Sequence, residues 1–309
     1  MLTYAILGPL EVRRDGALLP LAGQRQRALL ALLLLHANEV VPTERLIDRL
    51  WGEHPPRTAS TSLQNAVSQL RKLLGADALE TRPIGYVLAV GPGQLDLLRF
   101  EELSRRARHE EPRERAQTLA DALELWRGEP LAELAFESFA QGEIRRIEEL
   151  RVGAIEDRVD AELELDSEPS SGLVSELEGL VRDHPLRERF RAQLMLALYR
   201  AGRQAEALQA YHDARRTLVD GLGIEPGRPL QHLFGQILRQ ERALELSPET
   251  ILPESDAIDE IARAIAAGRL VTVLGTSASL SSHEGSATTA QLAGALAPRP
   301  VARRSTPAI

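Results

Sequence analysis

The residues best suited to chemistry lie between Thr58 and Leu74, where hydroxyl, amide and cationic side chains recur and no acidic residue occurs. At about 100° per residue around a helix, Thr61, Asn65, Ser68 and Lys72 share one face, with Arg71 at its edge. Amides can pair with adenine, Arg and Lys with guanine, and hydroxyls with phosphate or base edges. The pattern predicts a helix face that can enter the major groove of DNA.

The opposite face of the same helix is apolar and can pack on a core. Its members are Leu63, Ala66, Val67, Leu70, Leu73 and Leu74. An ordinary amphipathic surface helix would show the same two faces, so this helix alone leaves that alternative open. A solvated face, however, is usually rich in Glu and Lys, and this one carries no carboxylate.

The elements around this helix supply the rest of the argument. Short apolar runs broken by Gly8-Pro9 and Asp15-Gly16 predict three strands over 4–7, 10–12 and 18–19. Helices are predicted over 24–37, 44–51 with Thr43 as N-cap, and 60–74, followed by a hairpin of 79–82 and 86–90. This order of a small sheet, three helices and a hairpin is that of a winged helix. In that fold the third helix enters the major groove of DNA, and the hairpin, called the wing, contacts the DNA backbone.

Two arginines outside the third helix are expected to contact phosphates in such an arrangement. Arg82 is on the predicted wing, and Arg25 is at the start of the first predicted helix. Within the third helix, Asn65 and Arg71 are expected to contact base edges and Lys72 a phosphate.

Charge is uneven along the chain of 309 residues. The net charge is +1 for residues 1–96, -8 for 97–245 and -1 for 246–309. Phosphate binding requires cationic surface, so the acidic total argues against nucleic acid everywhere except in the first segment. The sequence therefore predicts a mainly α protein with three parts: a winged helix over 1–95, an all-α domain over 97–245 and a tail over 246–309.

The all-α segment contains one good tetratricopeptide-like unit. Tyr199, Gly202, Ala207, Tyr211 and Ala214 have the spacing of a helix, a glycine turn and a second helix that packs on the first. Both tyrosines are expected in the core. The repeat predicts a helical array without identifying its partner.

The tail contains a predicted helix over 257–267 and a strand over 270–274 followed by Gly275, while the last 30 or so residues have the composition of a disordered segment. A phosphate loop needs a Gly-Lys pair, which occurs nowhere in the chain. A dinucleotide site needs a doubly wound domain, for which too few residues remain. We therefore expect a remnant or regulatory tail, no cofactor and no nucleotide-dependent enzyme.

Composition excludes further classes of protein. Without cysteine there is no disulfide, thiol nucleophile or Cys-ligated zinc. The four histidines of the helical domain, His109, His184, His212 and His232, lack metal-ligand spacing, so no metal site is expected. The first residues of the chain lack the basic region of a signal peptide. The apolar run over 28–35 is far shorter than the roughly 20 residues of a membrane span. These features predict a cytoplasmic protein.

The chain from residue 1 to residue 245 resembles the Streptomyces antibiotic regulatory proteins, which join an OmpR-type winged helix to a bacterial transcriptional activation domain. The residues that carry the resemblance are Leu7-Gly8-Pro9-Leu10-Glu11-Val12, the run from Arg27 to Leu33, Leu50-Trp51-Gly52 with Pro55-Pro56, the segment from Leu63 to Arg71, and Gly85-Tyr86.

The resemblance implies a transcriptional activator of a specialised-metabolite gene cluster. It implies binding to direct repeats in promoter DNA as a head-to-tail homodimer, and recruitment of RNA polymerase holoenzyme through the helical domain. The alternative is a scaffold whose helical array binds protein partners, with any DNA binding secondary. Salt-dependent binding to a promoter fragment distinguishes the two.

Overall fold

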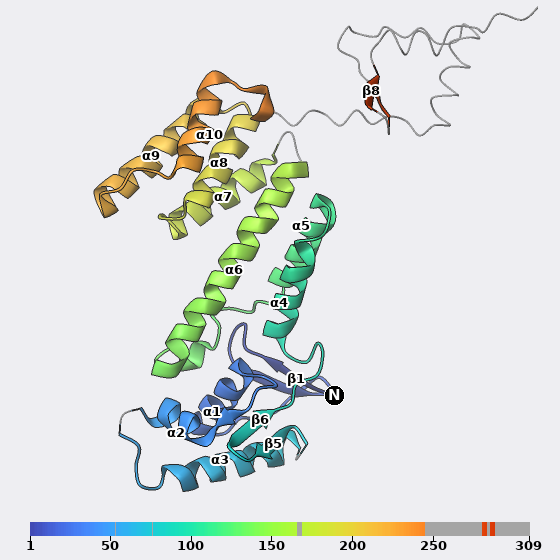
Figure 1. Ribbon diagram of the computed structural model, residues 1–309, viewed down its shortest axis with the longest axis vertical. Helices are drawn as coiled ribbons and strands as arrows, with labels where there is room; N and C mark the ends of the chain where they lie inside the picture. Colours follow the sequence, from blue (N-terminus) through green and yellow to red (C-terminus); the bar gives the residue numbers. More distant parts are fainter. Residues whose placement is uncertain (53, 76, 166–168, 245–279, 283–284, 288–309) are drawn as a thin grey trace, which may run out of the picture. The chain divides into compact units, whose positions relative to one another are not determined.

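The computed structural model describes residues 1–52, 54–75, 77–165, 169–244, 280–282 and 285–287. Met1 to Leu244 form one compact unit, and the residues from Glu245 onward belong to a second. Within the first unit, a small α+β part is followed by an all-α part (Figure 1). The mainly α fold with an N-terminal winged helix is thus confirmed.

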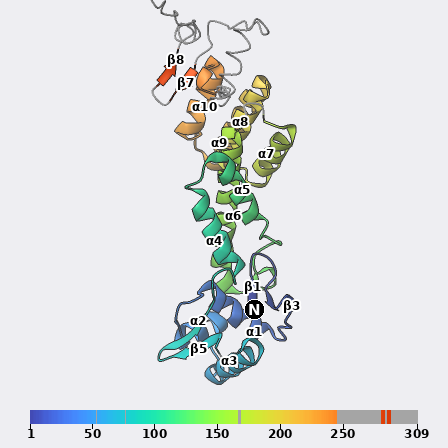
Figure 2. The same ribbon diagram turned by 90° about the vertical axis from the view of Figure 1, so that its right-hand side faces the viewer.

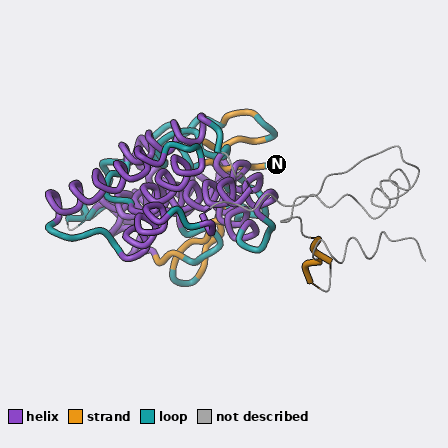
Figure 3. The backbone as a smooth tube through the Cα atoms, turned by 90° about the horizontal axis from the view of Figure 1, so that it is seen from above, coloured by secondary structure: helices purple, strands orange, loops and turns teal. Residues whose placement is uncertain are grey.

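An antiparallel sheet of three strands opens the chain. Strands β1 (Leu2–Ala5), β2 (Glu11–Arg14) and β3 (Ala17–Leu18) pair in chain order. The turn between β2 and β3 has positive φ at both Asp15 (51°) and Gly16 (84°), the residue types that tolerate this backbone in a tight hairpin. Figure 3 shows how little of the unit is strand.

Three helices and a second sheet complete the winged helix: α1 (Gln24–Leu35), β4 (Val41–Pro42), α2 (Thr43–Trp51), α3 (Ala59–Leu74), β5 (Leu79–Arg82) and β6 (Gly85–Leu88). The sheet order is β4-β6-β5, so β6 is central. The sequence did not predict β4, which is only two residues long. The prediction of Thr43 as N-cap was wrong, because Pro42 has that place and Thr43 is already helical.

The all-α part consists of α4 (Asp96–Ala107), α5 (Pro112–Leu123), α6 (Ser138–Leu165), α7 (Ser171–Asp183), α8 (Glu188–Arg200), α9 (Gln204–Leu222) and α10 (Arg228–Arg239), with short 3-10 turns η1 (Ala132–Leu134) and η2 (Arg242–Leu244). The breaks fall at the proline and glycine positions of the sequence, because proline cannot continue a helix and glycine takes the left-handed conformation that ends one. Gly202, at φ 73°, makes such a turn between α8 and α9.

Two apolar cores organise this unit. The first combines the winged helix with α4, α5 and α6 as far as Ala154, and the second lies among α6 to α10. Helix α6 contributes Ile147 and Ala154 to the first core and Val159 and Leu163 to the second. The first core is therefore continuous across the predicted boundary between residues 1–95 and 97–245.

The loop between β1 and β2 joins the winged helix to the all-α part. Asp96 accepts hydrogen bonds from the backbone N–H groups of Ile6 and Leu7, each at 2.9 Å, and Glu133 accepts that of Leu10 at 3.0 Å. The Arg127 N–H donates to the Leu7 carbonyl at 2.8 Å. We call these contacts the joint.

The Asp96 carboxyl of the joint is 10% exposed. Burial raises its pKa and outweighs the backbone N–H groups of Ile6, Leu7 and Leu97 and the Arg127 guanidinium, all of which lower it.

In the second unit, strands β7 (Leu280–Ser282) and β8 (Gly285–Ala287) pair antiparallel. The predicted helix over 257–267 and strand over 270–274 lie outside the described residues. No helix in the described part of the chain is long and apolar enough to cross a membrane.

Candidate DNA interface

Helix α3 presents the predicted polar face to solvent. Thr61, Asn65, Ser68 and Lys72 are all exposed, whereas the apolar residues of the opposite face are buried, with Leu73 half-buried. In Figures 1 and 2, α3 lies at the end of the first unit remote from α7–α10. The acid-free face of α3 is thus separated from α7–α10, which belong to the acidic segment.

Arg71 has a different environment from the other predicted α3 residues. Its Nε donates to the Leu79 carbonyl at 2.8 Å and one terminal nitrogen donates to the Thr81 hydroxyl at 2.6 Å. The guanidinium therefore fastens α3 to β5. A base contact by Arg71 stays a prediction, and it would require these two bonds to open or the remaining nitrogen to reach the base alone.

The wing is a tight hairpin whose tip is exposed. Arg82, the last residue of β5, forms an ion pair with Glu80 at 2.5 Å, with half of its side chain exposed. Ile84, in the turn, is 64% exposed. The Glu80 carboxylate partly offsets the charge that Arg82 would offer to a phosphate, so the wing contact also stays a prediction.

Arg25 is exposed at the start of α1 but is held within the protein. Its guanidinium donates to the Leu50 carbonyl and lies 4.5 Å from the centroid of the Trp51 ring. This cation–π contact and hydrogen bond fix Arg25 against the end of α2. A phosphate contact by Arg25 stays a prediction.

The exposed face of α3 also contains residues outside the predicted set. Ser60, Gln64 and Gln69 are exposed on the same helix, and Gln64 and Gln69 have amides that suit adenine. The helical spacing was signal enough to include both. In total, four of the seven predicted residues share the open α3 face, and Arg25, Arg71 and Arg82 have intramolecular partners.

Two family models match the chain. Residues 21–91 match the family described as "Transcriptional regulatory protein, C terminal", and residues 95–238 match the "Bacterial transcriptional activator domain". The first match contains α3 and the wing, and the second contains α4 to α9 and all of α10 except its last residue.

Relatives match over most of this chain. Regulatory protein AfsR of Streptomyces coelicolor is 42% identical over 81% of the chain, which spans only 25% of AfsR. Regulatory protein DnrI of Streptomyces peucetius is 36% identical over 78% of the chain and 93% of DnrI. The chain thus has nearly the extent of one relative and a quarter of the length of the other.

A solved structure shares the fold. Mycobacterium tuberculosis EmbR, in complex with a low affinity phosphopeptide, aligns with a TM-score of 0.74 at 33% sequence identity, covering 88% of this chain and 72% of EmbR.

Proposed function

Because the chain belongs to the Streptomyces antibiotic regulatory protein family, whose members are transcriptional regulators, we propose that it activates a specialised-metabolite gene cluster by binding promoter DNA through α3 and the wing. The observation that carries the proposal is the exposed, acid-free face of α3 beside an arginine-bearing hairpin. Binding of the full chain to promoter fragments near its own gene, measured over a range of salt concentrations, tests it. Affinity that is the same for random DNA would contradict the proposal.

Residues on the α3 face divide by chemistry. Asn65 contacts a base edge, because its amide offers one donor and one acceptor as adenine requires. Lys72 contacts a phosphate as a point charge, and Thr61 and Ser68 contact phosphate or base edges. Arg71 acts first by holding α3 and β5 together, so that helix and wing meet the DNA at a fixed spacing.

We expect Asn65→Ala to weaken operator binding by about 1 to 3 kcal/mol while leaving binding to random DNA unchanged, because a base-edge pair contributes only at the cognate base. Lys72→Ala is the matched comparison on the same face and should weaken both kinds of binding equally. Fluorescence anisotropy at one salt concentration measures both affinities. If Asn65→Ala leaves the ratio of the two affinities unchanged, Asn65 does not contact a base.

Two protomers bind one operator head to tail, on half-sites repeated in the same direction. The winged-helix segment has a net charge of only +1, so one copy has little non-specific affinity. Two copies about one helical turn apart, roughly 10 to 10.5 base pairs, place both α3 helices in major grooves on one side of the duplex. The acidic helical domains then point away from the phosphates, where they can contact RNA polymerase.

Changing the spacing between half-sites is expected to show this arrangement. Inserting about five base pairs rotates one half-site to the opposite side of the duplex and should abolish cooperative binding, whereas inserting a full turn should restore part of it. Gel-shift titrations of the three operators provide the measurement. Identical isotherms for all three would mean a monomer or a symmetric dimer on an inverted site.

A further inference from the structure

Strand β2 contacts the all-α part at its first residue and helix α3 at its last. Glu11 forms an ion pair at 2.8 Å with Arg127, which belongs to the connection between α5 and α6. At the other end of the strand, the Arg14 guanidinium donates to the Leu73 carbonyl of α3 at 2.7 Å. The strand is only four residues long, and each residue advances it by about 3.4 Å. One short strand therefore connects the helical domain to the C-terminal end of α3.

The alternation of side chains along β2 explains why Arg14 reaches α3. Successive side chains of a strand point to opposite faces of the sheet. Arg14 shares a face with Val12, which is fully buried in the first core together with Leu70 of α3. Arg13 shares the other face with Glu11, to which its guanidinium donates at 3.0 Å. Two neighbouring arginines thus differ in their partners, since Arg14 joins the hairpin to α3 and Arg13 bonds within the hairpin.

The carbonyl that accepts from Arg14 lies in the last turn of α3, which ends at Leu74. The last four carbonyls of a helix have no partner within the helix, and a cation near them also interacts favourably with the helix dipole. Leu73 is one of these four residues, so Arg14 supplies both a donor and a positive charge. Arg71 holds the same end of α3 against β5. The end of α3 is therefore fixed on two sides, by β2 and by β5.

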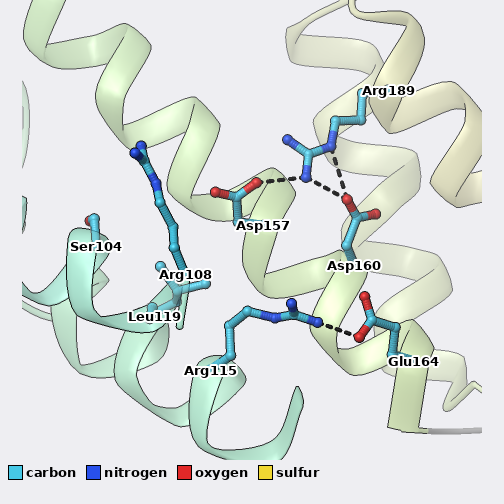
Figure 4. Close-up of a pocket in the computed structure, with 9 residues that line it drawn as sticks. Ser104, Arg108, Arg115, Leu119, Asp157, Asp160, Glu164 and Arg189 are labelled. Carbon is cyan, nitrogen blue, oxygen red and sulfur yellow. Dashed lines mark hydrogen bonds and ion pairs between the residues drawn. The ribbon is translucent and has the colours of Figure 1, made fainter. Parts of the chain in front are cut away.

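The helices behind the joint are themselves connected by ion pairs, as Figure 4 shows. Arg115 of α5 pairs with Glu164 of α6. Arg189 of α8 pairs with Asp157 of α6 at 2.6 Å, and its Nε donates to Asp160 of the same helix at 2.9 Å. Helices α5, α6 and α8 are thus tied to one another as well as, through the α5–α6 connection, to β2.

We propose that Arg14 is a positioning residue for DNA recognition, through which the helical domain sets the placement of α3 in the major groove. This inference rests on the proposed DNA-binding function, because Arg14 acts through α3. The constraint runs from Arg127 and Glu11 along β2 to Arg14. Arg14 holds the end of the helix, while Asn65 on the exposed face of α3 meets the base edge.

The test compares the affinities of full-chain variants for the operator and for random DNA, by fluorescence anisotropy over a series of salt concentrations. We expect Arg14→Ala to weaken operator binding about fivefold, the size expected when a cation at a helix C-terminus is lost. Arg13→Ala is the matched control, because it removes the same charge from the adjacent position and its contacts, with Glu11 and the Gly16 carbonyl, lie within the hairpin. Both variants should weaken binding to random DNA equally. Arg14→Lys keeps a cationic donor and should recover part of the operator affinity.

A double variant tests the connection to the helical domain. Glu11→Gln keeps the size of the side chain and weakens its ion pair with Arg127. If both residues act on the same placement of α3, the loss of operator affinity in Glu11→Gln/Arg14→Ala should be smaller than the product of the two single losses. Circular dichroism of each variant should match that of the wild type, because both residues are outside the helices.

Three results would overturn the proposal. Arg14→Ala and Arg13→Ala could have the same operator affinity, or the losses in the double variant could multiply as independent effects do. Arg14→Ala could also weaken operator and random DNA by the same factor and reduce the salt slope by about one relative to Arg13→Ala, which would make Arg14 a phosphate contact. In all three cases the wild type would still distinguish the operator from random DNA, so the proposed regulatory function would stand. A wild type that binds both equally would contradict the proposed function itself.

Discussion

Gly85→Ala is expected to lower operator affinity about 100-fold, equivalent to about 2.8 kcal/mol. Gly85 begins β6 and pairs with Pro42 of β4, so the backbones of the two strands lie very close together. A Cβ at this position would lie 1.9 Å from the Val41 carbonyl oxygen and 2.8 Å from the Pro42 Cα. Because both neighbours are backbone atoms, β4 must move away from β6, and the hairpin loses its place beside α3.

Circular dichroism and operator titration measure the effect of Gly85→Ala. Helical content should persist, because the atoms that a Cβ at Gly85 would meet belong to β4 and not to a helix. The control is Gly142→Ala in α6, where an added Cβ meets no atom within 4 Å and alanine favours the helix by up to about 1 kcal/mol. Wild-type operator affinity in Gly85→Ala would mean that the wing's position does not matter for binding.

Asp96→Asn should lower the free energy of unfolding of the first unit by about 2 to 4 kcal/mol. Both carboxylate oxygens accept backbone N–H groups: one from Ile6 and Leu97, the other from Ile6 and Leu7. An amide replaces one acceptor with a donor, which leaves a buried N–H unsatisfied and brings two donors face to face. Urea unfolding followed by circular dichroism measures the loss.

Asp121→Asn, at an exposed carboxylate of α5, should change stability by about 0.5 kcal/mol or less. An unchanged midpoint of urea unfolding for Asp96→Asn would mean that the joint does not stabilise the first unit.

Much of the helical framework could be predicted from local sequence signals. Helix α3 extends from Ala59 to Leu74 against a predicted 60–74, and its buried face is the predicted apolar face. The signal was strong because six apolar residues recur at helical spacing and glycine follows the last turn. Strand β4 was missed because two residues give no period, and it exists only because β6 supplies its partner.

The site was only partly predictable because partners distant in sequence decide where long side chains go. Asn65 and Lys72 are exposed as their helical positions require. Arg71 shares that helix, yet its guanidinium lies against Leu79 and Thr81 of β5. Arg25 likewise lies over Trp51. No local pattern states that a flexible cation will meet a carbonyl or an aromatic ring from another element, so contacts of this kind appear only in three dimensions.

Helix α6 also sets the order in which the chain can fold during synthesis. The first core takes Phe139, Ala140 and Ile147 from α6, although most of its other members precede residue 135. While α6 is still inside the ribosome, the winged helix therefore lacks the apolar side chains with which α6 completes the first core. Domains generally fold as units as they emerge, at about 5 to 20 residues per second. Here the first core has to wait several seconds for α6, so the winged helix cannot complete its core before α6 has emerged.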